Sequence, residues 1–107
     1  MKQQWDISLD TKDKFHPIIT IVIQKWDPFT YAVTLRATIH NETTDIRRWD
    51  NINKPDHVDI FYKKEPPKKH QKTSLGKMKK LSDLKKIFVH IAKNYKTFIQ
   101  EYKTPRG

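Results

Sequence analysis

The chain has 107 residues, a formal net charge of +10 at pH 7 and no cysteine. A chain of this length forms one domain with one hydrophobic core, and without cysteine it has no disulfide, no thiolate zinc site and no cysteine nucleophile. The longest apolar run, residues 17–23, is far shorter than the roughly 20 residues that cross a bilayer, and residues 1–6 lack the apolar core of a signal peptide. We therefore expect a soluble, cytoplasmic protein.

The positive charge is concentrated in one segment. Residues 1–62 have eight Lys and Arg against nine Asp and Glu, residues 63–86 have ten against two, and residues 87–107 have four against one. Such a basic segment attracts polyanions, for example RNA, DNA, an anionic membrane surface or an acidic protein. The alternative is a solvated, lysine-rich loop that keeps the protein in solution.

Five stretches have the composition of antiparallel strands. The stretch 15–26 is rich in β-branched residues on both faces, which indicates a central strand. In the stretch 31–40, apolar residues from Tyr31 to Ile39 alternate with polar ones, which is typical of a strand with one buried face. The predicted strands are residues 5–9, 15–26, 31–40, 45–49 and 57–62, with turns at residues 27–30 and 41–44.

The segment 63–80 is predicted to be a loop. It contains eight lysines, one glycine and the pair Pro66-Pro67. Proline has no N–H to donate to a ladder, so the preceding strand has to end there. We expect a charged connection between the last strand and the helix, with Leu75 and Met78 tying its far end to the core.

Residues 82–103 form the predicted helix. Eight apolar residues follow helical spacing along this stretch and make one broad apolar stripe. Ser82 is the predicted N-cap, and Asp83 suits the positive end of the helix dipole. Pro105 and Gly107 are expected to end the helix.

These elements predict an α+β fold. The apolar stripe of the helix cannot be hidden by the helix alone, so the helix should lie across the apolar face of the sheet. We predict an antiparallel meander of four to five strands with one long C-terminal helix packed on one face. The predicted single domain 1–107 is divided into a sheet over 5–62, a basic loop over 63–80 and a helix over 82–103.

The residues suited to chemistry are concentrated in residues 47–62. Strict alternation places Arg36, Arg47, Trp49, His57 and Asp59 on the sheet face away from the helix. On that face the arginines can hold phosphate, the tryptophan can stack on a base, and the histidine can transfer a proton. Metal-free ribonuclease chemistry needs such groups. A bulge at Trp49-Asp50 would reverse this assignment of faces.

Several of these residues also have a structural interpretation. Arg47 or Arg48 can form an ordinary cross-strand ion pair with a neighbouring aspartate. Asp50-Asn51 can be a turn whose side chains hold the backbone, and Trp49 can belong to the core. These alternatives stay open in the sequence.

His57 is the best single candidate for a catalytic residue, because Asp59 lies beside it on one face. A hydrogen-bonded structural histidine is the alternative. A divalent metal held by His57, Asp59 and Asp50 is another, but the spacing is not that of a known metal motif, and we expect no metal and no cofactor. Three other histidines have no carboxylate or second histidine at a spacing that suggests a site: His16, His70 and His90.

The segment Arg48-Trp49-Asp50-Asn51, followed by a proline and by His57-Val58-Asp59, resembles the small prokaryotic toxin-like proteins of the TumE family. That family has an Arg-Tyr/Trp-Asp-Asn segment, a His-x-His or His-x-Asp segment on the next strand, and a C-terminal helix. The resemblance extends over about residues 30–102. It implies the toxin of a toxin–antitoxin pair, encoded beside a DNA-binding antitoxin, with Arg48, Asp50, Asn51, His57 and Asp59 as its polar residues.

We therefore predict a toxin-like component of a prokaryotic toxin–antitoxin system that acts on RNA as a metal-independent endoribonuclease. The predicted catalytic residues are His57, Asp59, Arg48 and Asp50. The predicted nucleic-acid-binding residues are Arg36, Arg47, Trp49, Asn51, Lys63, Lys64, Lys68, Lys69 and Lys72. The expected partners are RNA and a cognate antitoxin, with no membrane and with a homodimer left open. The alternative is a non-catalytic accessory module that binds nucleic acid or protein through residues 63–86.

Overall fold

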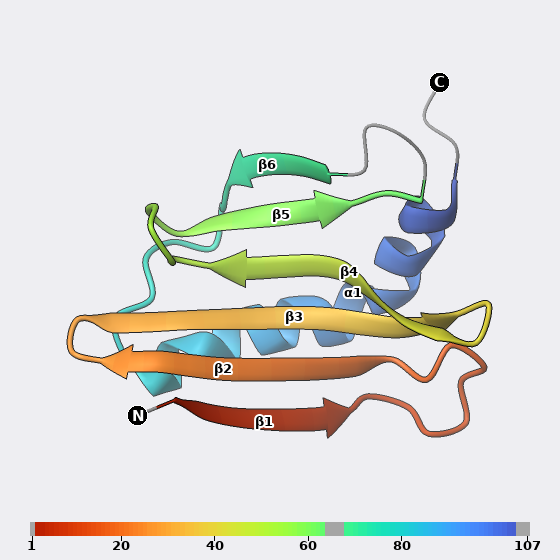
Figure 1. The fold of residues 1–107 in the computed structure, drawn as a ribbon, viewed down its shortest axis with the longest axis horizontal. Coiled ribbons are helices and arrows are strands. Elements are labelled where there is room, and N and C mark those ends of the chain that lie inside the picture. Colours follow the sequence, from red (N-terminus) through yellow and green to blue (C-terminus); the bar gives the residue numbers. More distant parts are fainter. Residues whose placement is uncertain (1, 64–67, 105–107) are drawn as a thin grey trace.

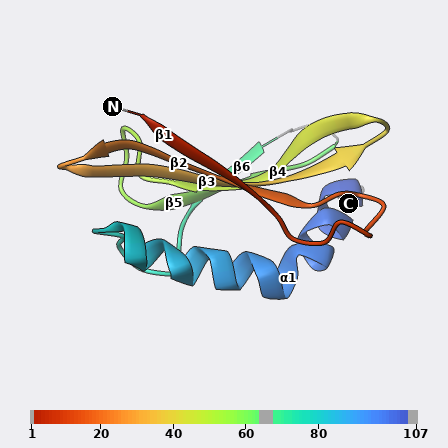
Figure 2. The same cartoon turned by 90° about the horizontal axis from the view of Figure 1, so that it is seen from below.

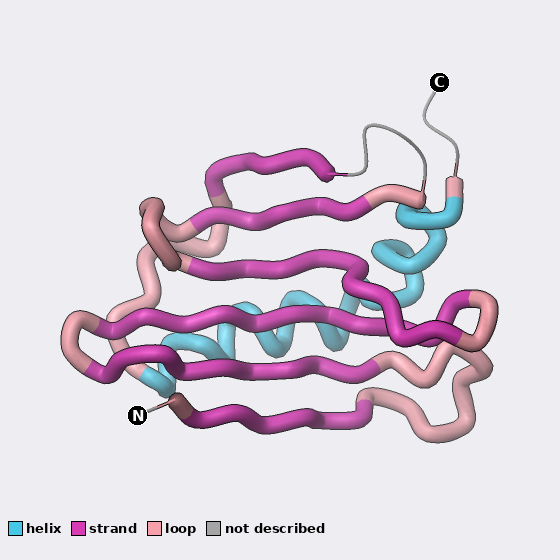
Figure 3. Tube along the Cα trace, viewed as in Figure 1, coloured by secondary structure: helices cyan, strands magenta, loops and turns pink. Residues whose placement is uncertain are grey.

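The computed structural model describes residues 2–63 and 68–104 and consists of one sheet and one long helix (Figure 1). The six antiparallel strands are β1 (Gln3–Ser8), β2 (Ile18–Trp26), β3 (Phe29–Ile39), β4 (Glu42–Asp50), β5 (His57–Phe61) and β6 (Lys68–Lys72). They lie in the sheet in chain order, so the chain is a meander (Figure 3). A 3-10 turn, η1 (Leu81–Leu84), leads into the helix α1 (Lys85–Lys103). The α+β class is confirmed, whereas four to five strands is too few.

The helix α1 lies along one face of the sheet, here called the helix face (Figure 2). The opposite face, here called the open face, is not covered by any helix within the described residues. No described helix is long and apolar enough to cross a membrane.

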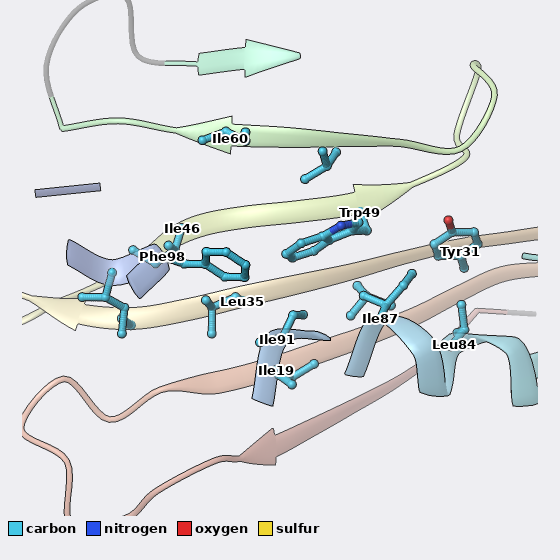
Figure 4. Packing of buried hydrophobic residues seen from close by; sticks show 14 of the residues in the cluster. Ile19, Tyr31, Leu35, Ile46, Trp49, Ile60, Leu84, Ile87, Ile91 and Phe98 are labelled. Carbon is cyan, nitrogen blue, oxygen red and sulfur yellow. The ribbon is translucent and has the colours of Figure 1, made fainter. Parts of the chain in front are cut away.

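The core fills the space between α1 and the helix face (Figure 4). The odd-numbered residues of β3 from Tyr31 to Ile39 are all buried, as their alternation predicted. From the helix, Ile87, Ile91 and Phe98 are buried against the sheet, so the apolar stripe is also confirmed. Burying side chains of this size contributes about 1.5–3 kcal/mol each, and this gain holds the helix on the sheet.

The connection between β3 and β4 is shorter than predicted. His40 and Asn41 form a two-residue turn with φ angles of 51° and 66°. Two consecutive left-handed residues match the right-handed twist of the flanking strands, and asparagine tolerates this conformation well. The predicted turn over 41–44 is therefore wrong at its end, because β4 already begins at Glu42.

The start of the helical region also differs from the prediction. Ser82 lies inside η1 and is not the N-cap. The carboxylate of Asp83 instead accepts the backbone N–H groups of Lys79 and Lys80, at 2.8 and 3.2 Å. These two hydrogen bonds lower the pKa of Asp83, and the one from Lys79 has the larger effect. The predicted end signals, Pro105 and Gly107, lie outside the described residues.

The segment 63–80 was predicted as a loop, but it contains the edge strand β6. This strand pairs antiparallel with β5, with Asp59 opposite His70. Its sequence, Lys-Lys-His-Gln-Lys, contains no apolar residue. Among the strands that the structure describes, it pairs with β5 alone. An edge strand can be held by backbone pairing without a buried face, so hydrophobic periodicity could not reveal it.

A β-bulge in β4 decides which side chains face the helix. Leu35 pairs with Arg47, but the next pair is Arg36 with Asp45, so Ile46 has no partner in β3. A bulge of this kind leaves two consecutive residues on nearly the same side of the sheet. Ile46 is fully buried under the helix and Arg47 also lies on the helix face. The predicted alternation, and with it the predicted open-face position of Arg47 and Trp49, is therefore wrong.

Candidate functional site

Three adjacent strands bring five polar side chains together on the open face. In the ladder Arg48 lies opposite Asp59 and Asp50 lies opposite His57, while Asp59 lies opposite His70 of β6. Residues directly opposite each other in an antiparallel pair project from the same face. These five residues, Arg48, Asp50, His57, Asp59 and His70, are here called the polar cluster.

Asp59 is the centre of the polar cluster and is only 3% exposed. One carboxylate oxygen, Oδ2, accepts a hydrogen bond from Arg48 Nη2 at 3.1 Å. The other, Oδ1, lies 2.9 Å from His70 Nδ1. A buried carboxylate is stable only when it is paired and hydrogen-bonded, so these contacts hold Arg48 and His70 on either side of Asp59.

Asp50 is the second buried carboxylate, with 4% of its surface exposed. Its Oδ2 forms an ion pair with Arg48 Nε at 3.1 Å. The Nε–H of Arg48 does not point at this oxygen, so the pair is not a hydrogen bond. Its Oδ1 accepts the backbone N–H of Ile52 at 3.0 Å and lies 3.3 Å from His57 Nε2. Arg48 thus bridges both carboxylates of the cluster, which fixes the position of its guanidinium.

The imidazole of His57 is buried, and its two nitrogens have different surroundings. Nδ1 lies 2.9 Å from the carbonyl oxygen of Pro55. A carbonyl oxygen only accepts, so Nδ1 has to be the donor. Nε2 faces the carboxylates, 3.3 Å from Asp50 and 3.9 Å from Asp59. The ring of His70 lies over that of His57, with centroids 4.3 Å apart.

The loop between β4 and β5 is held in place by two side chains. Asn51 accepts the Tyr31 N–H at 2.9 Å and donates to the Phe29 carbonyl at 2.8 Å. Asp56 accepts the Tyr31 hydroxyl at 2.7 Å and the Met78 N–H at 3.1 Å. Burial raises the pKa of the Tyr31 phenol, and the hydrogen bond to Asp56 raises it further. The loop therefore presents the Pro55 carbonyl to His57 from a rigid position.

The polar cluster borders a cavity of about 370 Å³ on the open face. This volume is within the range of small-molecule sites in proteins, roughly 300–1,000 Å³. A larger cavity of about 480 Å³, bordered by Phe15 and Ile99, contains no histidine, so its size alone does not mark a site for proton transfer. The cavity of the polar cluster is lined by Ala32, Arg48, Asp50, Ile52, Asn53, Lys54, His57, Asp59 and His70.

Two residues predicted to bind nucleic acid lie on the helix face. The guanidinium of Arg47 lies 3.9 Å from the centre of the Phe98 ring and pairs with Glu101 of α1. Burial lowers the pKa of Arg47, and Glu101 acts in the opposite direction. Trp49 is 2% exposed and contacts Phe98 and His90. The bulge at Ile46 is the physical reason for both corrections, and it makes Trp49 a core residue.

Two further predicted ligands of nucleic acid are engaged in structural contacts. Arg36 is on the open face but pairs with Asp45 at 2.9 Å and does not line the cavity. Asn51 uses both ends of its amide to hold the backbone of β3. The alternative stated for Asn51, a turn residue that fixes the chain, is the arrangement that the structure has.

The predicted lysines are spread over three places. Lys63 lies 3.3 Å from His40 Nε2, at the far end of β3. In β6, Lys72 is exposed and lines a small cavity with His57 and His70. Lys69 is exposed too, but it lies opposite Ile60, on the helix side of the strand. Lys64 and the side chain of Lys68 lie outside the described residues.

His70 is the one member of the polar cluster that the sequence did not indicate. It lies in a strand without apolar residues, so nothing assigned it to the sheet. A signal was present: a His-x-Asp segment on a strand needs polar neighbours, and His70 is the next histidine along the chain.

Comparison with known proteins yields no match to a family model, to a curated protein or to a solved structure. The chemistry of the polar cluster therefore has to indicate the function. Its histidines can accept and donate protons, its arginine can bind an anion, and its nitrogen and oxygen atoms can bind a metal ion.

Proposed function

We propose that the protein acts on RNA as an endoribonuclease and that the polar cluster is its active site. The observation that carries the proposal is the pairing of two imidazoles, His57 and His70, with a guanidinium beside one cavity. Two groups able to transfer protons and one fixed cation are what cleavage of RNA by its own 2′-hydroxyl requires.

In the proposed reaction His57 Nε2 removes the proton from a 2′-hydroxyl, whose oxygen attacks the adjacent phosphorus. Arg48 lines the cavity, where it would stabilise the negative charge on the phosphoryl oxygens. The bond to the 5′-oxygen then breaks, and protonated His70 gives that oxygen a proton. The products are a 2′,3′-cyclic phosphate and a free 5′-hydroxyl, so atoms and charges balance without a metal.

Asp59 would orient His70 by accepting its Nδ1–H, which leaves Nε2 of His70 for the proton transfer. The side chain of His70 is 40% exposed, so a polymer can reach it. Asp50 and the Pro55 carbonyl would hold His57 from two sides. Asp50, which we predicted to be catalytic, is in this scheme a positioning residue.

The biological setting of this activity is part of the same proposal. The resemblance of Arg48-Trp49-Asp50-Asn51 and His57-Val58-Asp59 to the TumE family supports a prokaryotic toxin, neutralised by a cognate antitoxin and acting in the cytoplasm. The antitoxin is not needed for the chemistry at the cavity, so cleavage of RNA can be tested with the isolated chain.

The test is cleavage of total RNA in EDTA by the wild-type chain and by His57→Ala and His70→Ala. General acid–base groups typically contribute about 10²–10⁴-fold, so each variant should lose cleavage by at least a factor of about 100. The control is His40→Asn, at an exposed turn histidine with φ 51° that asparagine tolerates. Wild-type rates in His57→Ala, with thermal unfolding showing a folded protein, would remove His57 from the mechanism.

A non-catalytic module that binds nucleic acid through the basic segment 63–86 is the second candidate. The observation that favours it is the exposure of Lys77, Lys79, Lys80, Lys85 and Lys86, all charged and near one another in the chain. In that case Lys→Glu changes would abolish function and His57→Ala would be silent.

A further inference from the structure

The contact between His57 and Asp50 has a chemical consequence. Because Nδ1 of His57 donates to the Pro55 carbonyl, Nε2 of the neutral ring carries a lone pair. That lone pair faces Asp50 Oδ1 at 3.3 Å, and a carboxylate oxygen is also an acceptor. Two acceptors at this distance need positive charge beside them. Arg48 Nε, 3.1 Å from Asp50 Oδ2, supplies part of it, and a metal ion bound at Nε2 would supply more.

The surrounding atoms have the arrangement that a metal ion needs. One ligand atom each from His57, Asp59 and His70 lies within 4.8 Å of the other two. Bonds of about 2.1 Å to a tetrahedral ion place its ligands about 3.4 Å apart, so these atoms have to close in by at most about 1.4 Å. Two of the residues belong to β5 and one to β6, and the ladder Asp59–His70 sets their spacing.

The groups around these three residues are those that typically support a metal site. A ligating histidine usually donates its other N–H to a carbonyl or carboxylate, which fixes the tautomer and directs the lone pair at the metal. The Pro55 carbonyl does this for His57. Arg48 holds Asp59 in the same way, by donating to Oδ2. Asp50, 3.3 Å from His57 Nε2, is a candidate fourth ligand.

We propose that His57, Asp59 and His70 bind a divalent transition metal, with Zn²⁺ as the representative ion. Two imidazoles and a carboxylate suit Zn²⁺ and its neighbours in the first transition series, whereas Mg²⁺ and Ca²⁺ prefer oxygen ligands alone. The metal would take the Nε2 lone pair that the proposed reaction uses, so it would suppress RNA cleavage. That consequence rests on the proposed function, but binding of the ion does not.

The test of binding uses the whole chain without RNA. After removal of metals with EDTA and dialysis, calorimetric titration with Zn²⁺ should give one site per chain. Loss of a supporting group around a metal typically weakens binding about 10–100-fold, so loss of a ligand in His70→Ala should weaken it by about 100-fold or more. His40→Asn is the matched control and should bind as the wild type does.

Two readouts separate this site from non-specific binding. Zn²⁺ should shift the ring resonances of His57 and His70 and leave those of His16, His40 and His90 in place. It should also raise the midpoint of thermal unfolding of the wild type but not of His70→Ala. Binding that is unchanged in His70→Ala, ring shifts confined to other histidines, or no saturable binding would each overturn the proposal.

The effect of Zn²⁺ on RNA cleavage is measured separately. If the chain binds Zn²⁺ but cuts no RNA in EDTA, the metal site stands and the proposed function fails. If it cuts RNA in EDTA and binds no Zn²⁺, the proposed function stands and the metal site fails.

Discussion

Arg47 and Arg48 are adjacent in the chain, but they lie on opposite faces of β4 and have different partners. Arg47 lies over Phe98 and pairs with Glu101 of the helix, so it belongs to the rim of the core. Arg48 lies on the open face, between the buried carboxylates of Asp50 and Asp59. The same side chain is thus a structural clamp in one position and part of a polar cavity in the other.

The difference between the two arginines extends to their neighbours. On the helix face Arg47 borders the apolar core, and burial of that core stabilises the fold. On the open face the side chains near Arg48 are two carboxylates and two imidazoles, whose burial has to be offset by pairing. We therefore expect changes on the helix face to lower stability and changes on the open face to lower activity.

The largest effect on stability is expected for Trp49→Ala on the helix face. Replacing a buried aromatic residue by alanine typically costs about 3–5 kcal/mol, and Trp49 is 2% exposed. The matched control is Trp26→Ala, since Trp26 is 48% exposed and should cost less than about 0.5 kcal/mol. Urea unfolding measures both. Equal losses would contradict the assignment of Trp49 to the core.

The two arginines themselves give the next test. Arg48→Met leaves Asp50 and Asp59 without their shared cation and should lower RNA cleavage by about 10²–10³-fold, as for other lost charge-stabilising groups. Arg47→Met keeps an apolar chain over Phe98 and should cleave RNA within a factor of a few of the wild type. Single-turnover cleavage of the same RNA compares them. A larger loss in Arg47→Met would reverse the proposed roles.

The positive charge near the cavity gives a smaller effect. Each lysine that contacts phosphate should lower the slope of log affinity against log salt by about 1 when it is replaced. Lys72→Glu, beside His57 and His70, should therefore reduce both RNA affinity and its salt dependence. Lys93→Glu, an exposed residue on the helix, is the control. Filter binding at several salt concentrations measures both variants. A larger effect of Lys93→Glu would contradict binding of RNA at the cavity.

The smallest effect is expected at His90, between Trp49 and Phe98 on the helix face. Burial, followed by repulsion from Arg47, lowers the pKa of His90 below its ordinary value of 6.5. The unfolded chain then binds the proton more readily, so the free energy of unfolding falls as the pH drops through 6.5. In His90→Phe this part of the pH dependence should disappear. The urea midpoints of the wild type and of His90→Phe at pH 7.5 and pH 5.5 measure this effect. The same difference between the two pH values in both proteins would contradict the role of His90.

The fold could be predicted where a buried face leaves a period in the sequence. The odd-numbered residues of β3 and the apolar stripe of α1 are both read in this way, and both are buried as predicted. The strand β6 could not be found, because backbone pairing at the edge of a sheet requires no apolar side chain. His70 was missed for the same reason.

The faces of Arg47 and Trp49 were mispredicted because of a single extra residue. Ile46 and Trp49 are three residues apart, and strict alternation would place them on opposite faces. Both are buried under the helix, so a bulge between or beside them is required. That odd spacing of two large apolar residues was visible in the sequence, but without the register of β3 the position of the bulge could not be fixed.

The most direct test of the account compares two oligonucleotides of one sequence in EDTA, one made of ribonucleotides and one of 2′-deoxyribonucleotides. The account predicts that the wild-type chain cuts the ribonucleotide strand, leaves 2′,3′-cyclic phosphate ends, and does not cut the deoxy strand, since the 2′-hydroxyl is the nucleophile. Cleavage of both strands, or of neither, would contradict the claim that His57, His70 and Arg48 form a ribonuclease site on the open face.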